Sequence, residues 1–109
     1  MTIRPLDDTI GVCAQITVED LPGIAAQGYR SLICNRPDDE EPGQPSFAEI
    51  AAAASALGLQ ARHIPVAGGV FPPDAVAAFG AAMAELPGPV LAYCRSGARS
   101  TTMRQLSVG

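Results

Sequence analysis

Short, continuous apolar runs alternate with longer amphipathic stretches along this chain. Two of these runs cover residues 31–34 and 90–93 and contain almost no polar residue. Each run is bounded by turn-forming or charged residues. Such runs are typical of strands covered on both faces in a parallel sheet. The stretch 59–66 predicts a further core strand, and the two short apolar segments 3–6 and 10–14 predict a strand, a turn and a second strand.

Helical spacing of apolar residues marks the segments between these strands. Ser46 and Glu49 have the spacing of a capping box, and the apolar positions that follow predict a helix that ends at Gly58. Asp74 is expected to open another helix, with its apolar face toward the core. Thr17 and Asp20 also have capping-box spacing and predict a short helix that ends near Gly28.

The alternation of strands and helices predicts an α/β fold. We expect a single domain over residues 1–109, built on a mostly parallel central sheet of about four to five strands with flanking helices. The length and the 48% hydrophobic content are sufficient for one core. A last helix over 100–106 would have only two turns, so it must dock on the rest of the domain to be stable.

Composition narrows the setting in which the protein works. Three cysteines form neither a disulfide framework nor a zinc-binding spacing, so we expect a reducing, cytoplasmic environment and no metal or cofactor. The net charge of −4 argues against a nucleic-acid partner. No leader-like segment and no apolar run of membrane-spanning length is present, so neither secretion nor a membrane partner is expected.

The segment from Cys94 to Ser100 carries the chemistry. Cys94 follows an apolar strand, and the sequence Arg95-Ser96-Gly97-Ala98-Arg99-Ser100 opens into a helix. Backbone N–H groups of such a turn converge on one point, and the helix N-terminus adds a positive dipole. A cysteine beside cations in this position ionises below the free-thiol pKa of about 8.5, so Cys94 is the candidate nucleophile.

Each loop residue receives a predicted role. Arg99 and the backbone N–H groups of residues 96–100 would stabilise the bound anion, with Gly97 and Ala98 shaping the loop. Arg95 is expected at the mouth of the loop, where it recruits an anionic donor. We also expect the hydroxyl groups of Ser96 and Ser100 to hydrogen-bond the thiolate.

A long acidic segment, 35–45, leaves the carboxyl end of a predicted parallel strand, at the edge where Cys94 lies. Open α/β sheets bind ligands at that edge, so Arg36 could reach the anion, or it could support the anion-binding residues from behind, together with Asp38 and His63. For phosphoester hydrolysis, Asp38, Asp39 or Glu40 is a candidate proton donor. The lone histidine, His63, is more often a structural residue than a catalyst at such a position.

Two further cysteines, Cys13 and Cys34, fall in predicted strands. Both are expected to be small apolar core residues, since unpaired cysteine is among the most buried residue types. For Cys34 a second interpretation stays open, because its place at a strand end could bring it near Cys94 as a resolving thiol.

The Cys-x-x-Gly-x-Arg-Ser arrangement resembles the active-site loop shared by rhodaneses and cysteine-dependent phosphatases. With Asn35-Arg36-Pro37-Asp38 and His63-Ile64-Pro65-Val66, it is similar to the bacterial beta-lactamase-hydrolase-like family. This resemblance implies a dual-specificity-like cysteine phosphatase fold, with the Cys-x4-Arg loop between the last strand and a helix. It also implies sulfurtransferase or phosphatase activity, and a fusion to, or partner from, sulfur metabolism.

The spacing of the loop favours one of these reactions. The phosphatases that it resembles have five residues between cysteine and arginine, whereas four separate Cys94 from Arg99, as in rhodaneses. The acid that those phosphatases carry after the third core strand is also missing, since Ala67-Gly68-Gly69 stands there. The leading hypothesis is therefore sulfur transfer, with sulfane sulfur passing from a small anionic donor to a thiol acceptor through a Cys94 persulfide.

Two alternatives remain at this point. An atypical cysteine phosphatase would hydrolyse a phosphoester through a phosphocysteine at Cys94. An inactive module would use the same loop only to bind an anion or a phosphorylated partner.

Overall fold

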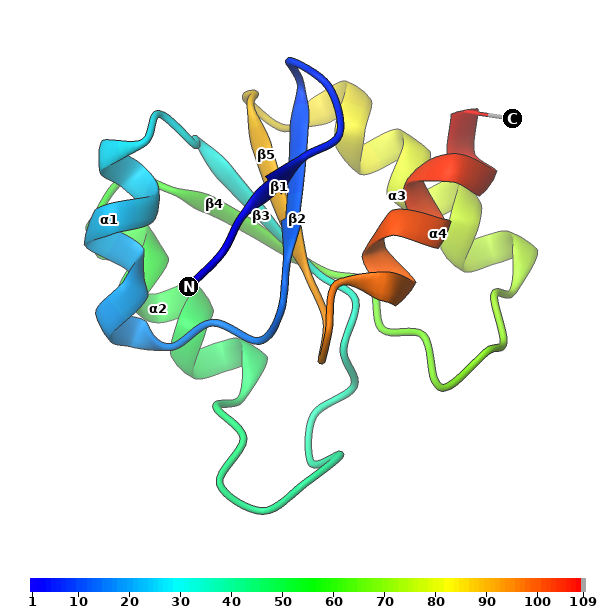
Figure 1. The fold of residues 1–109 in the computed structure, drawn as a ribbon, viewed down its shortest axis with the longest axis horizontal. Helices are drawn as coiled ribbons and strands as arrows, with labels where there is room; N and C mark the ends of the chain where they lie inside the picture. The colour runs from blue at the N-terminus through cyan, green and yellow to red at the C-terminus, as the bar shows by residue number, and fades with distance from the viewer. Residues whose placement is uncertain (109) are drawn as a thin grey trace.

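The computed structural model describes residues 1–108. Strands and helices follow one another in the order that the hydrophobic pattern predicts (Figure 1). The elements are β1 (Arg4–Pro5), β2 (Ile10–Cys13), the 3-10 turn η1 (Val18–Asp20), α1 (Leu21–Ala26), β3 (Ser31–Cys34), α2 (Phe47–Ala56), β4 (Gln60–His63), α3 (Pro73–Glu85), β5 (Val90–Tyr93) and α4 (Ala98–Val108).

One five-stranded sheet with the order β1-β2-β5-β3-β4 forms the centre of the fold. The short strand β1 is antiparallel to β2, and all other neighbours are parallel. Strand β5 lies between β2 and β3, and Val90 is paired with Ile10 on one side and with Ser31 on the other. The predicted α/β class and its mostly parallel sheet are thereby confirmed.

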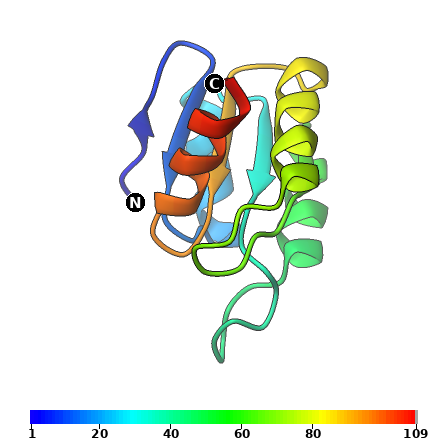
Figure 2. The ribbon, with the colours of Figure 1, turned by 90° about the vertical axis from the view of Figure 1, so that its right-hand side faces the viewer.

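Helices cover both faces of the sheet, with α1 and α2 on one side and α3 and α4 on the other (Figures 1 and 2). The side chains of β5 alternate accordingly. Val90 and Ala92 belong to the core beneath α3 and α4, whereas Leu91 and Tyr93 belong to the core beneath α1 and α2. Burial on both faces explains why this strand is an uninterrupted apolar run.

The last helix is longer than the sequence pattern predicts. Instead of two turns over 100–106, α4 starts directly after Gly97 and runs from Ala98 to Val108. Met103 is fully buried in the core beneath α3 and α4, so the helix has the docking that its length requires.

Other element ends shift by a few residues for local reasons. Strand β4 spans Gln60–His63, short of the predicted 59–66, although the Ile64 and Val66 N–H groups still donate to the Cys34 and Asn35 carbonyls at 2.9 and 3.1 Å. Helix α3 begins at Pro73 rather than Asp74, since the fixed φ of proline suits a first helical turn. The Ser46 hydroxyl accepts from the Glu49 N–H at 3.1 Å and caps α2 as expected.

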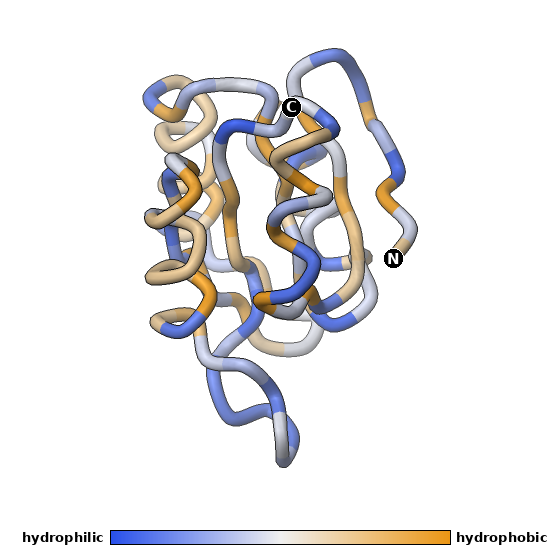
Figure 3. Tube along the Cα trace, turned by 90° about the vertical axis from the view of Figure 1, so that its left-hand side faces the viewer, coloured by the Kyte–Doolittle hydropathy of each residue, from blue (hydrophilic) through white to orange (hydrophobic). Residues whose placement is uncertain are grey.

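The carboxyl ends of the parallel strands meet at one edge of the sheet, at the bottom of Figure 1. Residues 35–46, which connect β3 to α2, extend from this edge, and Figure 3 shows that the outer part of this loop is hydrophilic. Across residues 1–108, no helix has the length and apolar character needed to cross a bilayer.

Candidate functional site

Cys94 lies directly after β5, at the centre of the carboxyl edge of the sheet, and its side chain is buried. The Gly97 N–H donates to Cys94 Sγ at 3.0 Å. Burial is the largest influence on the Cys94 pKa and raises it, but hydrogen bonds from loop backbone N–H groups outweigh burial and lower the pKa below the ordinary thiol value. These N–H groups belong to Ser100, Ser96, Gly97 and Arg99.

The other two cysteines are held as neutral thiols. Burial raises the pKa of Cys13 to about 12, and burial also raises the pKa of Cys34. The Cys34 thiol donates to the Arg36 carbonyl at 3.4 Å. Cys94 is therefore the one thiol of the three whose surroundings favour the thiolate.

Gly97 allows the loop to turn beneath the thiolate. Its φ of +97° lies in the region that L side chains rarely adopt, and an added Cβ would lie 3.4 Å from the Cys13 carbonyl. The glycine thus lets the loop pack against the end of β2 while its N–H points at Cys94.

The hydroxyl groups of the two loop serines do not bind the thiolate as predicted. The Ser100 hydroxyl donates to Asn35 Oδ1 at 2.9 Å, and the Ser96 hydroxyl accepts from the Ala98 N–H at 3.3 Å. Their contribution to the thiolate comes from the backbone N–H groups instead. The Asn35 side chain in turn donates to the Ile64 carbonyl at 2.9 Å, which ties the first turn of α4 to β3 and to the end of β4.

Arg99 lies at the site, held by groups from two other loops. Its Nη1 and Nη2 donate to the two carboxylate oxygens of Glu40, each at 2.8 Å, and Nη1 also donates to the Val66 carbonyl at 2.8 Å. Only 13% of the Arg99 side chain is exposed. The paired carboxylate raises the pKa of Arg99, which stays charged at any physiological pH.

Glu40 cannot be the proton donor that the sequence left open. Hydrogen bonds from Arg99 and Arg36 hold its pKa at about 2, despite partial burial. A carboxyl group with this pKa is ionised at neutral pH and has no proton to give. The sequence offers Glu40 as one acid among several, and nothing in its pattern marks it as the partner of Arg99.

Arg36 is buried with 1% of its side chain exposed, and its donors are already engaged. Nε donates to Glu40 Oε1 at 2.8 Å, Nη2 to Glu41 Oε1 at 3.1 Å and Nη1 to Gln15 Oε1 at 3.2 Å. In this structure Arg36 thus directs its N–H groups to Glu40, Glu41 and Gln15, and a direct contact with an anion stays a prediction. Its guanidinium binds carboxylates of the acidic segment. Glu40, which accepts hydrogen bonds from both arginines, links Arg36 to Arg99.

Asp38 and His63 have structural contacts. Asp38 Oδ1 accepts from the Phe47 N–H at 2.8 Å, at the first turn of α2. His63 Nε2 donates to the Arg36 carbonyl at 2.9 Å, and its ring stacks on Phe47 with 4.7 Å between centroids. Arg95 lies at the mouth of the loop as predicted, with 69% of its side chain exposed and Glu41 at 3.6 Å.

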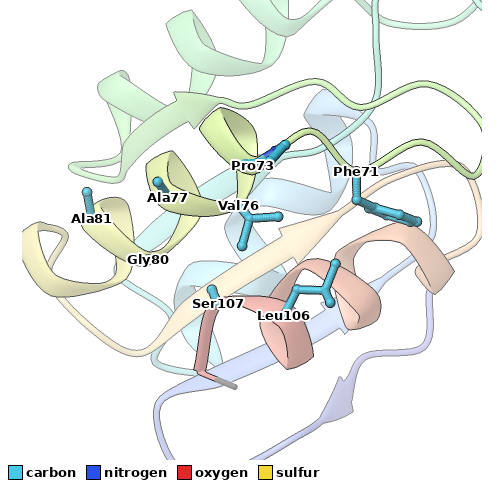
Figure 4. A pocket seen from close by; sticks show the side chains of 8 residues that line it. All are labelled: Phe71, Pro73, Val76, Ala77, Gly80, Ala81, Leu106 and Ser107. Carbon is cyan, nitrogen blue, oxygen red and sulfur yellow. The ribbon is translucent and has the colours of Figure 1, made fainter.

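The surface of residues 1–108 includes two hollows of interest. One of about 520 Å³ borders the loop at Ser96, Gly97 and Ala98 and is also lined by Arg4 and Cys13. The other, of about 490 Å³, lies between α3 and α4, and its lining includes Phe71, Val76 and Leu106 (Figure 4). Only the first adjoins the nucleophile loop.

Residues 2–109 match the family described as Beta-lactamase hydrolase-like protein, phosphatase-like domain. The chain belongs to this family. A beta-lactamase hydrolase-like protein of Agrobacterium fabrum is 39% identical over 98 residues, which cover 90% of this chain and 23% of the relative. The chain thus spans about a quarter of the length of that relative.

Solved structures place the phosphatase-like domain among phosphatase folds. A candidate phosphatase from Neisseria meningitidis is 36% identical, with a TM-score of 0.88, over 95% of this chain and 74% of the other. The core catalytic domain of the PP-IP phosphatase SIW14 from S. cerevisiae shares the fold at 13% identity and a TM-score of 0.67, over 96% of this chain and 75% of the other. The predicted family and the cysteine-phosphatase fold are confirmed, and the comparisons favour the phosphatase alternative over the sulfurtransferase that loop spacing placed first.

Proposed function

We propose that this phosphatase-like domain is a cysteine-dependent phosphatase that works through a phosphocysteine at Cys94. The observation that carries the proposal is the lowered pKa of Cys94 inside a loop of converging N–H groups, beside Arg99. A thiolate nucleophile and an adjacent set of hydrogen-bond donors are the two parts that phosphoryl transfer to cysteine requires. The family and the fold support the same choice.

In the first step, Cys94 Sγ forms a bond to phosphorus while the bond from phosphorus to the leaving-group oxygen breaks. The electron pair of that bond departs with the leaving group. The backbone N–H groups of residues 96–100 and the Arg99 guanidinium bind the phosphoryl oxygens as charge develops on them. In the second step, water forms a bond to phosphorus while the bond from phosphorus to Cys94 Sγ breaks. The electron pair of that bond restores the Cys94 thiolate, and the proton of the water leaves with inorganic phosphate or passes to solvent.

The surroundings of Cys94 indicate which substrates would react. Glu40 is ionised, Asp38 accepts from the Phe47 N–H, Asp39 is exposed on the acidic segment, and residues 67–69 carry no acid. A leaving group that is stable as an anion needs no proton donor, so an aryl phosphate or a phosphoanhydride would suit this site best.

A second candidate is sulfur transfer, which the four-residue spacing between Cys94 and Arg99 favours. Here Cys94 Sγ attacks the outer sulfur of thiosulfate, the S–S bond breaks and sulfite leaves. A thiol acceptor in its thiolate form then takes the outer sulfur from the Cys94 persulfide and releases the Cys94 thiolate. A reducing compartment such as the cytoplasm would keep Cys94 competent for either reaction.

Intact-protein mass spectrometry distinguishes these functions. The protein and a Cys94→Ser variant are exposed separately to phenyl phosphate and to thiosulfate, and released phosphate is measured in parallel. Phosphate release that requires Cys94, without a sulfur adduct, supports the phosphatase. A gain of one sulfur that requires Cys94 and is reversed by excess thiol, without phosphate release, replaces it with the sulfurtransferase. If neither phosphate release nor a sulfur adduct is observed, anion binding remains as the role of the loop.

A further inference from the structure

Arg36 is the largest fully buried side chain among residues 1–108. Burying a guanidinium is costly unless its charge is paired and its N–H groups are bonded. Arg36 meets this condition with Glu40, Glu41 and Gln15, at 2.8, 3.1 and 3.2 Å. The guanidinium is therefore firmly held. Among the described residues, its side-chain hydrogen bonds go to Glu40, Glu41 and Gln15 and to no residue of the loop 94–100.

Glu40 links this buried cation to the site. Its Oε1 accepts from Arg36 Nε and from Arg99 Nη2, and its Oε2 accepts from Arg99 Nη1, all at 2.8 Å. The carboxylate is therefore shared by two arginines that lie 63 positions apart in the sequence. Because Arg36 is buried and fixed, it sets where the carboxylate lies.

The guanidinium of Arg99 has two edges that can each bind an anion through two N–H groups. Glu40 occupies the edge formed by Nη1 and Nη2, and the Val66 carbonyl takes a further Nη1 donor. The edge formed by Nε and the remaining Nη2 hydrogen is left for an anion. The negative charge of Cys94 also raises the pKa of Arg99, as expected for a guanidinium near the sulfur.

We propose that Arg36 is a positioning residue for the anion site, holding Glu40 so that Glu40 fixes one edge of Arg99 and leaves the other for the anion bound over Cys94. The inference rests on the proposed function for the identity of that anion as a phosphoryl group. Arg36 acts through another residue and does not touch the substrate. Its removal would weaken anion binding and turnover together, because the same donors hold the ground state and the transition state.

The test measures anion binding without requiring turnover. Inorganic phosphate that fills the loop should protect Cys94 from alkylation by iodoacetamide, and peptide mass spectrometry separates Cys94 from Cys13 and Cys34. The variants are Arg36→Lys, Glu40→Gln and the double variant. The matched control is Arg62→Lys, because Arg62 pairs with Glu85 at 2.9 Å on the exposed surface. Thermal unfolding shows that each variant is folded.

The phosphate concentration for half-protection should rise about tenfold or more in Arg36→Lys, the scale seen when a residue that orients a binding group is changed. The control should match the wild type. Because Arg36 acts through Glu40, the double variant should be no weaker than Glu40→Gln alone. Additive losses, unchanged protection in Arg36→Lys, or no protection of the wild-type protein would each overturn the inference.

Glu40→Asp provides a second route should Arg36→Lys not fold. It keeps the negative charge, but its shorter side chain cannot bridge both arginines, so it should also weaken protection. Normal protection in this variant would contradict the positioning role. A wild-type protein that phosphate protects but that hydrolyses no phosphoester would refute the proposed phosphatase while leaving this inference intact.

Discussion

The nucleophile loop, 94–100, and the acidic segment, 35–45, contribute to one site in different ways. In the loop, every N–H group that lowers the pKa of Cys94 comes from within six residues of the sulfur. Glu40, in contrast, binds Arg99 from 59 positions away, and its location depends on the buried Arg36. Local backbone geometry thus provides the thiolate, whereas long-range ion pairing orients the arginine that accompanies it.

Cys94→Ser should have the largest effect, because it removes the group on which the loop converges. We expect turnover and every covalent adduct to fall to background, while the melting temperature stays near that of the wild type, since the change is small. Activity assays with phenyl phosphate, intact-mass measurement and thermal unfolding test this. Substantial activity in the variant would contradict nucleophilic catalysis by Cys94.

Arg99→Ala removes the residue at which the two regions meet. The loss of one preorganised donor to a developing anion costs about 10²–10³-fold in kcat, and we expect a loss of this size. Arg95→Ala is the matched comparison, since Arg95 is exposed at the mouth of the loop and should mainly raise KM for charged substrates. Equal losses of kcat in both variants would show that the two arginines do not differ in role.

Gly97→Ala tests the local region alone. At φ +97° an alanine should cost roughly 1–2 kcal/mol in the free energy of unfolding, and the displaced N–H should raise the pKa of Cys94. Urea unfolding and the pH dependence of Cys94 alkylation measure the two effects. Gly69→Ala is the control, because nothing lies within 4 Å of its added Cβ and its φ is not in the left-handed region. A neutral effect at both glycines would refute the strain argument.

Glu40→Gln tests the long-range region and should lower the free energy of unfolding by roughly 1 kcal/mol near neutral pH, the scale of a partly exposed ion pair. Pairing lowers the pKa of Glu40 from 4.5 to about 2. Its stabilising contribution is therefore present above about pH 4.5 and is lost as the pH falls toward 2. Urea unfolding at pH 6, 4 and 3 should show the difference between wild type and variant shrinking.

Asp7 also has its pKa lowered to about 2, through hydrogen bonds from Thr9. Asp7 is present in both the wild type and Glu40→Gln, so the difference between their free energies of unfolding reports on Glu40 alone. A difference that does not change with pH would mean that the charge of Glu40 contributes nothing to stability.

The site itself was only partly predictable. Cys94 and its loop are recognisable because nucleophile, glycine and arginine lie within a few residues, where backbone geometry follows from the local sequence. The partners of Arg36 and of the Ser100 hydroxyl could not be predicted from the sequence. Each depends on a partner from another part of the chain, Glu40 in one case and Asn35 in the other. Residue type alone cannot tell whether a guanidinium binds substrate or a carboxylate of its own protein.

The sequence alone determined the order of strands and helices, because apolar periodicity and caps are local signals, and it located the thiolate loop at the end of a buried strand. Tertiary structure decided which acid meets Arg99, that this acid is ionised, and that α4 extends to Val108 by docking through Met103. These features depend on the path of the loop between β3 and α2 and on packing beneath α3. Such contacts form only when segments far apart in the chain are brought to one edge of the sheet.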